Sequence, residues 1–363
     1  MSADASHVLP DRARAAAPAD GQPGLCTERE ITAPVDLCRA DGRLEPSAVG
    51  WSRRPLHRCN LHGAPGRKKR WDYWCVTTDT HLFSMTYADL DYVGLADARL
   101  LEYASQRVVE TAVMVPLARG FAQPETVGGG RIVLEHRRLH LELGEEPGGT
   151  RLRARCATPR GALDADLFVA LPPAHETLSV VVPWNERRFQ YTSKHNTRPA
   201  TGCVRIGGEE HRFGPHNGAF GCLDFGRGVW PWRSAWNWAS ASGLQGGHTV
   251  GLNLGGKWTD GTGSTENGIC LDGRLHKLSE DLVWEYDRTN WTAPWRIRTP
   301  RSQRLALRFT PFFHKAAALN LGLLATDLNV LFGHFDGVLI GDGGERIEVG
   351  GLVGWAEEHL ARW

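Results

Sequence analysis

The chain has 363 residues, which is enough to bury a core without disulfide bonds and to form two domains or one large β architecture. Its 42 basic and 41 acidic side chains nearly cancel, so there is no overall field of the kind that gathers nucleic acid. Eight widely spread cysteines without a C-x-x-C pair favour a reduced, cytoplasmic protein and no zinc site. No apolar run approaches the roughly 18 to 20 residues of a transmembrane helix, so we expect no membrane span.

The chain opens with a segment rich in alanine, proline and charge, which predicts a disordered lead over residues 1–27 and no signal peptide. A proline-rich stretch before a strongly apolar strand suggests a boundary near residue 175. We therefore expect an N-terminal β domain over 28–175 and a C-terminal β domain over 176–363.

Most of the chain shows the period-2 alternation of half-buried strands, punctuated by glycine, proline and aspartate. The clearest strands are predicted over 71–76, 82–92, 131–143, 150–156, 162–171, 177–183, 188–193, 248–256 and 304–311. Helical periodicity occurs only in short pieces, at 88–102, 231–242 and 315–323. The pattern predicts an all-β fold of two barrel or sandwich domains with few, peripheral helices.

A basic run at residues 67–70 has the composition of a nucleic-acid patch, but four charges at a glycine-proline turn are more often simply solvated. We expect no nucleic-acid partner.

The stretch 220–295 holds eight of the fourteen tryptophans, interleaved with ionisable groups. Large rings combined with a few polar groups are typical of a concave, mostly dry ligand site. The residues that we expect to bind a ligand there are Arg227, Trp230, Trp236, Trp238, Asn253, Trp258 and Asp260.

Three residues of this stretch are candidate catalysts: Asp224, Glu266 and His248. Asp224 has Arg227 three residues away, which either orients an acid tuned by burial or forms a structural pair with it. His248 begins a strand and is, by residue type, more often structural than catalytic. Glu266 points into the cavity or, more often for such a sequence, belongs to a turn.

Strand alternation over 248–254 places His248, Val250, Leu252 and Leu254 on one face. The other face carries Asn253 beside a glycine, which would admit a ligand close to the backbone. Further on, Glu285 is either solvated or a buried acid, depending on which face of its strand is covered.

The motifs of serine hydrolases, P-loop enzymes, zinc proteases and dinucleotide-binding proteins do not occur in the sequence. We therefore expect no cofactor.

Several long blocks resemble the bacterial and fungal family named domain of unknown function 2804. They include VGWSRRPLHRCNL, RKKRWDYWCV, VPWNERRFQYTSKHN, LDFGRGVWPWRSAWNWA and GHTVGLNLGGKWTDGTGSTENG, and the resemblance runs from about Ile31 to Trp363. It implies a distant relationship to calycin-like β-barrels, among which carotenoid hydratases and cofactor-free cyclases pair two lipocalin-like domains. The family has no assigned catalytic residues, so none can be carried over.

Three hypotheses about function follow. The first is a cofactor-independent hydratase, isomerase or cyclase for a lipophilic small molecule, in which Asp224 or Glu266 donates a proton and tryptophan faces stabilise positive charge. The second is a carrier that holds a lipid-like ligand without chemistry. The third is a glycan-binding or glycan-processing protein, because tryptophan also stacks on sugar rings.

Overall fold

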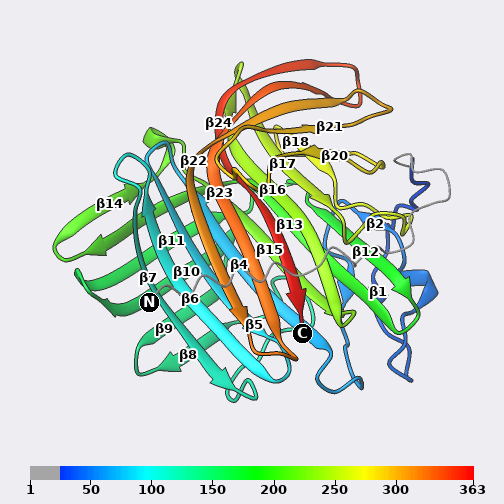
Figure 1. Cartoon of the computed structure of the whole chain (residues 1–363), viewed down its shortest axis with the longest axis horizontal. Coiled ribbons are helices and arrows are strands. Elements are labelled where there is room, and N and C mark those ends of the chain that lie inside the picture. Colours follow the sequence, from blue (N-terminus) through cyan, green and yellow to red (C-terminus); the bar gives the residue numbers. More distant parts are fainter. Residues whose placement is uncertain (1–24) are drawn as a thin grey trace, which may run out of the picture.

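The computed structural model describes residues 25–363. The chain folds into two large, curled antiparallel sheets, which lie across one another in Figure 1. This confirms the predicted all-β class built from two barrel-like parts. Residues 1–24 of the predicted disordered lead lie outside the described residues. Of the rest of that lead, Leu25 forms a bridge with Glu280, and the amide of Cys26 donates to the carbonyl of Ser279 at 2.8 Å.

The first sheet has thirteen strands, ten of them in the order β7-β6-β5-β4-β15-β13-β11-β10-β9-β8. Its strands are β2 (Trp51–Ser52), β4 (Lys68–Thr77), β5 (His81–Asp89), β6 (Val93–Glu102), β7 (Arg107–Pro116), β8 (Ile132–His136), β9 (Leu139–Glu146), β10 (Gly149–Thr158), β11 (Gly161–Ala170), β12 (Leu178–Asn185), β13 (Arg188–Ile206), β14 (Glu209–Phe213) and β15 (Phe220–Val229). The sheet curls until β7 approaches β10, where the hydroxyl of Thr111 donates to the carbonyl of Ala157 at 3.0 Å.

The second sheet has nine strands in the order β19-β18-β17-β16-β24-β23-β22-β21-β20. These strands are β16 (Arg233–Gln245), β17 (His248–Gly256), β18 (Gly268–Leu271), β19 (Arg274–Lys277), β20 (Val283–Glu285), β21 (Trp295–Arg298), β22 (Leu305–Asn320), β23 (Ala325–Ile340) and β24 (Arg346–Arg362). The remaining elements are a parallel pair, β1 (Val35–Asp36) and β3 (His57–Arg58), and two 3-10 turns, η1 (Pro46–Ala48) and η2 (Pro215–Asn217). The described part of the chain has no helix long and apolar enough to cross a bilayer.

The expected boundary between residues 175 and 176 falls between β11 and β12, and both strands belong to the first sheet. The chain passes to the second sheet only after β15, through the short connection at residues 230–232.

Alternation along the strands explains how each sheet forms. In β11, Leu163, Ala165, Leu167 and Val169 are buried, while the residues between them face outward. An outward acid on this strand meets an arginine of the neighbouring strand, since Asp164 lies opposite Arg155 in register and accepts its Nε at 3.0 Å. The sequence therefore places one face in the core and the other in water.

The three predicted helical segments are wrong. Residues 88–102 form the end of β5 and all of β6, residues 231–242 lie mostly in β16, and residues 315–323 lie mostly in β22. In β6, Gly94, Ala96, Ala98 and Leu100 share one face, and the last three are buried in the core. Small and branched apolar residues fit both helical and strand spacing, so pairing with neighbouring strands decided the outcome.

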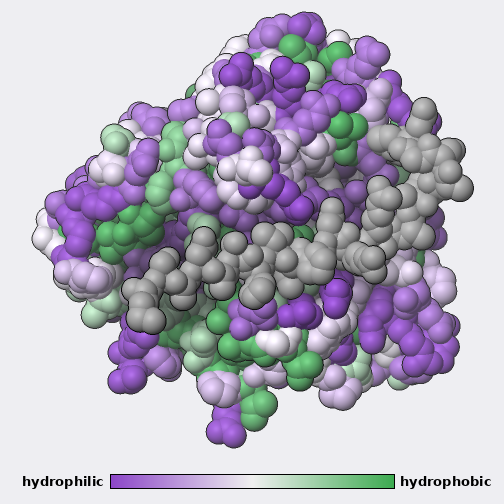
Figure 2. Space-filling view, viewed as in Figure 1, coloured by the Kyte–Doolittle hydropathy of each residue, from purple (hydrophilic) through white to green (hydrophobic). Residues whose placement is uncertain are grey.

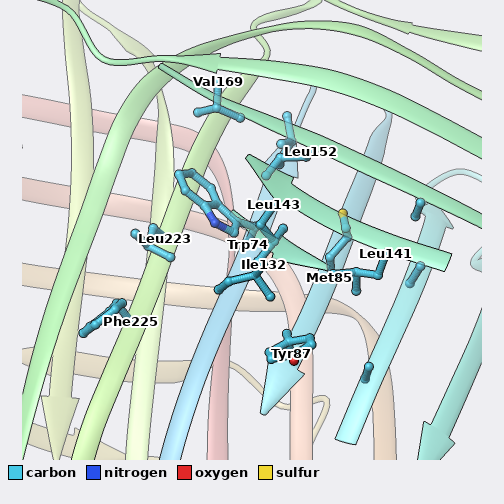
Figure 3. Close-up of a cluster of buried hydrophobic side chains, with 14 of the residues drawn as sticks. Trp74, Met85, Tyr87, Ile132, Leu141, Leu143, Leu152, Val169, Leu223 and Phe225 are labelled. Atoms are coloured by element: carbon cyan, nitrogen blue, oxygen red, sulfur yellow. The ribbon is translucent and has the colours of Figure 1, made fainter. Parts of the chain in front are cut away.

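Apolar side chains form four buried clusters. One fills the curl of the first sheet, where Figure 3 shows Trp74, Met85, Tyr87 and Leu223 among its members. A second fills the curl of the second sheet. The other two lie where the sheets meet, and they combine residues from both, such as Cys222 of β15 with Trp355 of β24. Polar residues cover much of the outer surface, although apolar residues gather on the lower part of the face in Figure 2.

Candidate functional site

A buried lysine bridges two carboxylates where the two sheets meet. Lys194 of β13 lies opposite Asp224 of β15 in register, and its Nζ is 2.9 Å from Asp224 Oδ2. The same Nζ is 3.2 Å from Oε2 of Glu266, which belongs to the loop between β17 and β18. The exposed fractions of the three side chains are 5%, 11% and 2%. A charge removed from water is tolerated only when it is paired in this way.

The charges in this cluster shift one another's protonation. Burial on its own lowers the pKa of Lys194, but the carboxylates of Asp224 and Glu266 outweigh it and the net pKa is raised. Burial raises the pKa of Glu266, and the charge of Asp224 adds to that rise, so Lys194 offsets only part of it. The amine therefore stays charged, while Glu266 takes up a proton more readily than an ordinary glutamate.

A fourth ionisable group, Glu357 of β24, lies close to this cluster. Its side chain retains some accessible surface, but dense protein surrounds the carboxyl group, and this burial raises the pKa of Glu357 to about 7. The indole of Trp236 donates to Oε1 at 2.8 Å and limits the rise, whereas Asp224 and Glu266 add to it. Glu357 therefore keeps a proton at a higher pH than an ordinary glutamate does.

Tryptophan side chains form the walls of the site and donate to its acceptors. Trp258 Nε1 donates to Glu266 Oε1 at 2.7 Å, and Trp238 Nε1 donates to Asn253 Oδ1 at 2.8 Å. The ring of Trp238 also faces Lys194, with Nζ 4.2 Å from the ring centre. Both indoles thus pair their N–H groups, and Trp238 also offers its ring face to the charge of Lys194.

Backbone geometry brings Glu266 into this position. Gly255 lies beneath the Glu266 side chain, and a Cβ atom at this residue would lie 2.2 Å from Glu266 Oε1. Asn253 holds the same loop, since its Nδ2 donates to the backbone carbonyl of Glu266 at 2.6 Å. The glycine is thus required by the close approach of a side chain to the strand.

The structure brings together seven of the ten residues that the sequence suggested for the site. They are Asp224, Glu266, Trp230, Trp236, Trp238, Asn253 and Trp258. Trp230 takes part through the tryptophan wall, stacking on Trp258 with ring centres 5.5 Å apart and donating to Gln190 Oε1 at 2.7 Å. The interpretation of Glu266 as a turn residue is wrong, because its side chain is buried in the cluster.

Arg227 lies on the opposite face of β15 from Asp224. It is buried inside the first sheet, where its Nη2 is 2.7 Å from Asp72 Oδ2 and its Nη1 donates to the carbonyl of Trp71 at 2.7 Å. Residues three apart on a strand point to opposite faces, so Arg227 does not orient Asp224.

His248 and Asp260 also lie outside the cluster. His248 is half exposed at the start of β17 and pairs with Asp272 at 2.7 Å. Asp260 is exposed in a turn, where its Oδ1 accepts the amide of Lys257 at 2.8 Å. Glu285, for which the sequence left two possibilities, is exposed.

Sequence reasoning missed Lys194 and Glu357. The predicted strand over 188–193 ended one residue before Lys194, although continued alternation would have placed Lys194 on the same face as Thr192, whose hydroxyl donates to Asp224 Oδ1 at 3.1 Å. Glu357 lies two residues after Trp355 in the last strand, so the two share one face, and this spacing of ring and carboxylate was available as a signal.

A small cavity adjoins the cluster at Lys194. Its volume is ≈ 10 Å³, which is space for about one water molecule. The residues that line it are Glu176, Thr177, Leu178, Lys194, Asn196, Asn253, Gly268, Cys270 and Leu275. Asn253 therefore does face a cavity, as alternation along its strand suggested, although the space suits a water molecule rather than a larger ligand. Within residues 25–363, no group of three or more histidine, cysteine or acidic side chains is placed to hold a metal ion.

Solved structures with a similar course of the chain share little sequence with it. A protein named provisionally as AttH from Nitrosomonas europaea is 13% identical, with 84% of this chain and 98% of that chain covered and a TM-score of 0.47. CghA is 11% identical, with 82% and 88% covered and a TM-score of 0.39. Kievitone hydratase from Nectria haematococca is 10% identical, with 84% and 93% covered and a TM-score of 0.41. At these scores the likeness carries no argument about function.

No curated protein matches the chain significantly. The model of one family matches residues 28–363, and that match includes every residue of the cluster described above. The chain belongs to the family described as domain of unknown function DUF2804.

Proposed function

We propose that the protein is a cofactor-independent enzyme that carries out acid–base chemistry on a lipophilic small molecule between its two sheets. Hydration, isomerisation and cyclisation all fall within this class. The observation that carries the proposal is the buried Lys194–Asp224–Glu266 cluster with the partly protonated Glu357 beside it. Functional sites commonly combine a neutral acid with an ionised base in a dry setting.

The four groups divide into two roles. Glu357 holds a proton near neutrality and is the acid that would protonate an alkene or a carbonyl group. In a hydration, water would then form the C–O bond and lose a proton to the carboxylate of Glu266. Proton exchange would then return Glu357 to its protonated form and Glu266 to its carboxylate form. Lys194 would hold Asp224 in place through their ion pair. This assigns the donor role to Glu357 in place of Asp224, because Asp224 is paired with the lysine.

The tryptophan walls supply the second part of the argument. A cation that develops on a substrate carbon is stabilised by the faces of aromatic rings, as the charge of Lys194 is by the ring of Trp238. Indole rings also offer apolar contact to a ligand that carries few polar groups.

The ligand must enter by moving side chains, since the cavity at Lys194 is ≈ 10 Å³ and small-molecule sites usually occupy about 300 to 1,000 Å³. Ring-against-ring contacts occur where the sheets meet, for example between Tyr73 of β4 and Trp238 of β16, with ring centres 5.9 Å apart. Such contacts can separate without breaking strands. We therefore infer that the ligand displaces tryptophan side chains between the sheets.

The glycan hypothesis loses support from the same contacts. Sugar-binding tryptophans present a free face in an open groove, whereas Trp230, Trp238 and Trp258 are 3%, 6% and 8% exposed.

The test begins with native mass spectrometry of the freshly purified protein, followed by denaturing extraction and identification of any released molecule. The same apolar extract is then incubated with the wild type, with Glu357→Gln and with the control Glu285→Gln, and products are followed by mass. Conversion that Glu357→Gln abolishes and Glu285→Gln retains supports the enzyme. Retention of a ligand without its conversion would show that the protein is a carrier and not an enzyme. The proposal is overturned if no ligand is retained and no conversion is seen.

A further inference from the structure

The hairpin of β22 and β23 ends in an exposed apolar tip. Leu319, Leu321 and Leu323 are 47%, 65% and 74% exposed, and no charged residue occurs from Ala316 to Thr326. Leucines in this setting are unfavourable in water unless another surface covers them.

Other exposed apolar side chains lie at the same end of the molecule. Arg362 donates to Asn320 Oδ1 in the hairpin tip at 3.1 Å, and the next residue, Trp363, donates its amide to the carbonyl of Trp232 at 3.1 Å. Trp232 itself is 42% exposed. In Figure 2 one patch of apolar residues on the visible face lies toward this end, near the C-terminus marked in Figure 1.

Arginines surround these apolar side chains. Arg67 lies over the ring of Trp232 with its guanidinium carbon 5.6 Å from the ring centre, and Arg233 faces Arg362 across β16 and β24. Arg188 lies at the same end, because the next residue, Phe189, pairs with Val229 at the end of β15, three residues before Trp232. Within residues 25–363, Arg188, Arg233 and Arg362 have no carboxylate side chain within ion-pair distance, whereas Arg67 donates to the main-chain oxygen of Trp363 and the nearby Arg70 pairs with Asp89 at 3.1 Å. The surface thus keeps uncompensated positive charge although the net charge of the chain is only +1.

We propose that this end of the molecule docks on an anionic phospholipid bilayer. The hairpin surface is defined by Leu319, Leu321, Leu323, Trp232, Arg67, Arg188, Arg233 and Arg362. Its leucines insert among the acyl chains, Trp232 lies at the level of the headgroups, and the arginines contact lipid phosphates. The inference rests on the proposed function and deepens it. An enzyme for a lipophilic substrate would collect that substrate from a bilayer.

A second copy of the chain fits this surface less well. Pairing two copies through the same surface would bring the arginines of one copy toward those of the other, and like charges that meet at an interface are unfavourable. A bilayer rich in phosphatidylserine offers the opposite charge and an apolar layer together.

The experiment measures co-sedimentation of the full chain with vesicles of phosphatidylcholine, with and without about one third phosphatidylserine. We expect binding to the anionic vesicles that weakens as salt increases. Leu321→Glu/Leu323→Glu should reduce the partition coefficient about tenfold or more. Arg188→Gln/Arg233→Gln should reduce it about fivefold for each arginine removed.

A matched control is available at the other end of β16. Leu244 is 64% exposed, close to the level of Leu321, and lies roughly 35 Å along the strand from Arg233. Leu244→Glu should bind vesicles like the wild type. The proposal is overturned if Leu244→Glu weakens vesicle binding as much as Leu321→Glu/Leu323→Glu does. It is also overturned if the wild type does not bind anionic vesicles at low salt. A dimer in sedimentation velocity that Leu321→Glu/Leu323→Glu dissociates would overturn it as well, since a second copy would then be what covers this surface.

The outcome is separable from that of the proposed enzyme. Glu357→Gln should bind vesicles like the wild type, because Glu357 lies between the sheets. Loss of vesicle binding with turnover intact would refute only the docking surface, and vesicle binding without ligand or turnover would refute only the enzyme.

Discussion

Lys194 and Asp224 face each other across β13 and β15, with Nζ 2.9 Å from Oδ2 in a setting where both side chains are nearly excluded from water. The second carboxylate, Glu266, reaches the same amine from the other sheet at 3.2 Å. One lysine thus links the two sheets through charge. Its removal would leave two buried carboxylates without a cation.

Lys194→Met is therefore expected to destabilise the protein by about 3 to 5 kcal/mol. The measurement is the free energy of unfolding from chemical denaturation at neutral pH. Adding Asp224→Asn and Glu266→Gln to the same chain should restore much of the loss, because no unpaired charge then remains. As a control, Arg346→Ala breaks an exposed pair with Glu348 and should cost less than about 1 kcal/mol. Equal losses for Lys194→Met and the control would contradict the coupling.

The raised pKa of Glu357 predicts a dependence of stability on pH. The folded-state pKa of about 7 exceeds the ordinary value of 4.5, so between these values the folded state binds more protons than the unfolded state. The stability contributed by Glu357 is then complete below about pH 4.5 and falls as pH rises toward 7, by up to about 3 kcal/mol. Glu357→Gln should remove this loss, so the difference in unfolding free energy between variant and wild type should grow from pH 5 to pH 8. A constant difference would show that the carboxyl group titrates normally.

The indole of Trp258 is expected to stabilise the ionised form of Glu266. Trp258→Phe keeps most of the ring contact with Trp230 but removes the donor 2.7 Å from Glu266 Oε1. Leaving a buried acceptor without its donor costs about 1 to 3 kcal/mol. The stability loss should therefore be larger at pH 8, where Glu266 is more ionised, than at pH 5. Trp232→Phe at the exposed surface serves as the control, and the prediction fails if both variants lose the same stability at both pH values.

Arg227 is expected to matter for the fold of the first sheet and not for the chemistry. Its guanidinium group pairs with Asp72 inside that sheet, with both side chains nearly buried. Arg227→Met should destabilise by about 3 to 5 kcal/mol because Asp72 is left buried and unpaired, and Asp72→Asn on the same chain should recover part of the loss. Ligand retention, measured by native mass spectrometry at a temperature where the variant is folded, should not change. A folded variant that loses its ligand would return Arg227 to the site.

The sequence alone determined where most strands run and which face of each is buried. Period-2 alternation needs only neighbouring residues, so it located β10, β11 and β17 and put Val250, Leu252 and Leu254 on the core face of β17. The density of tryptophan and ionisable residues also placed the predicted site in the stretch 220–295, and seven of the ten residues suggested there meet in the structure. The alternation rule, applied to residues three apart, would have separated Arg227 from Asp224.

Tertiary structure decided which strands meet. Asp224 pairs with Lys194 across neighbouring strands. Glu266 contacts that lysine, and Glu357 lies near it, only because β17 and β24 belong to a second sheet that packs on the first. Alternation specifies a face without specifying its partner, and the pKa of Glu357 depends on the depth of that packing. The three segments expected to be helical show the same limit, because pairing with distant strands outweighed their local propensity.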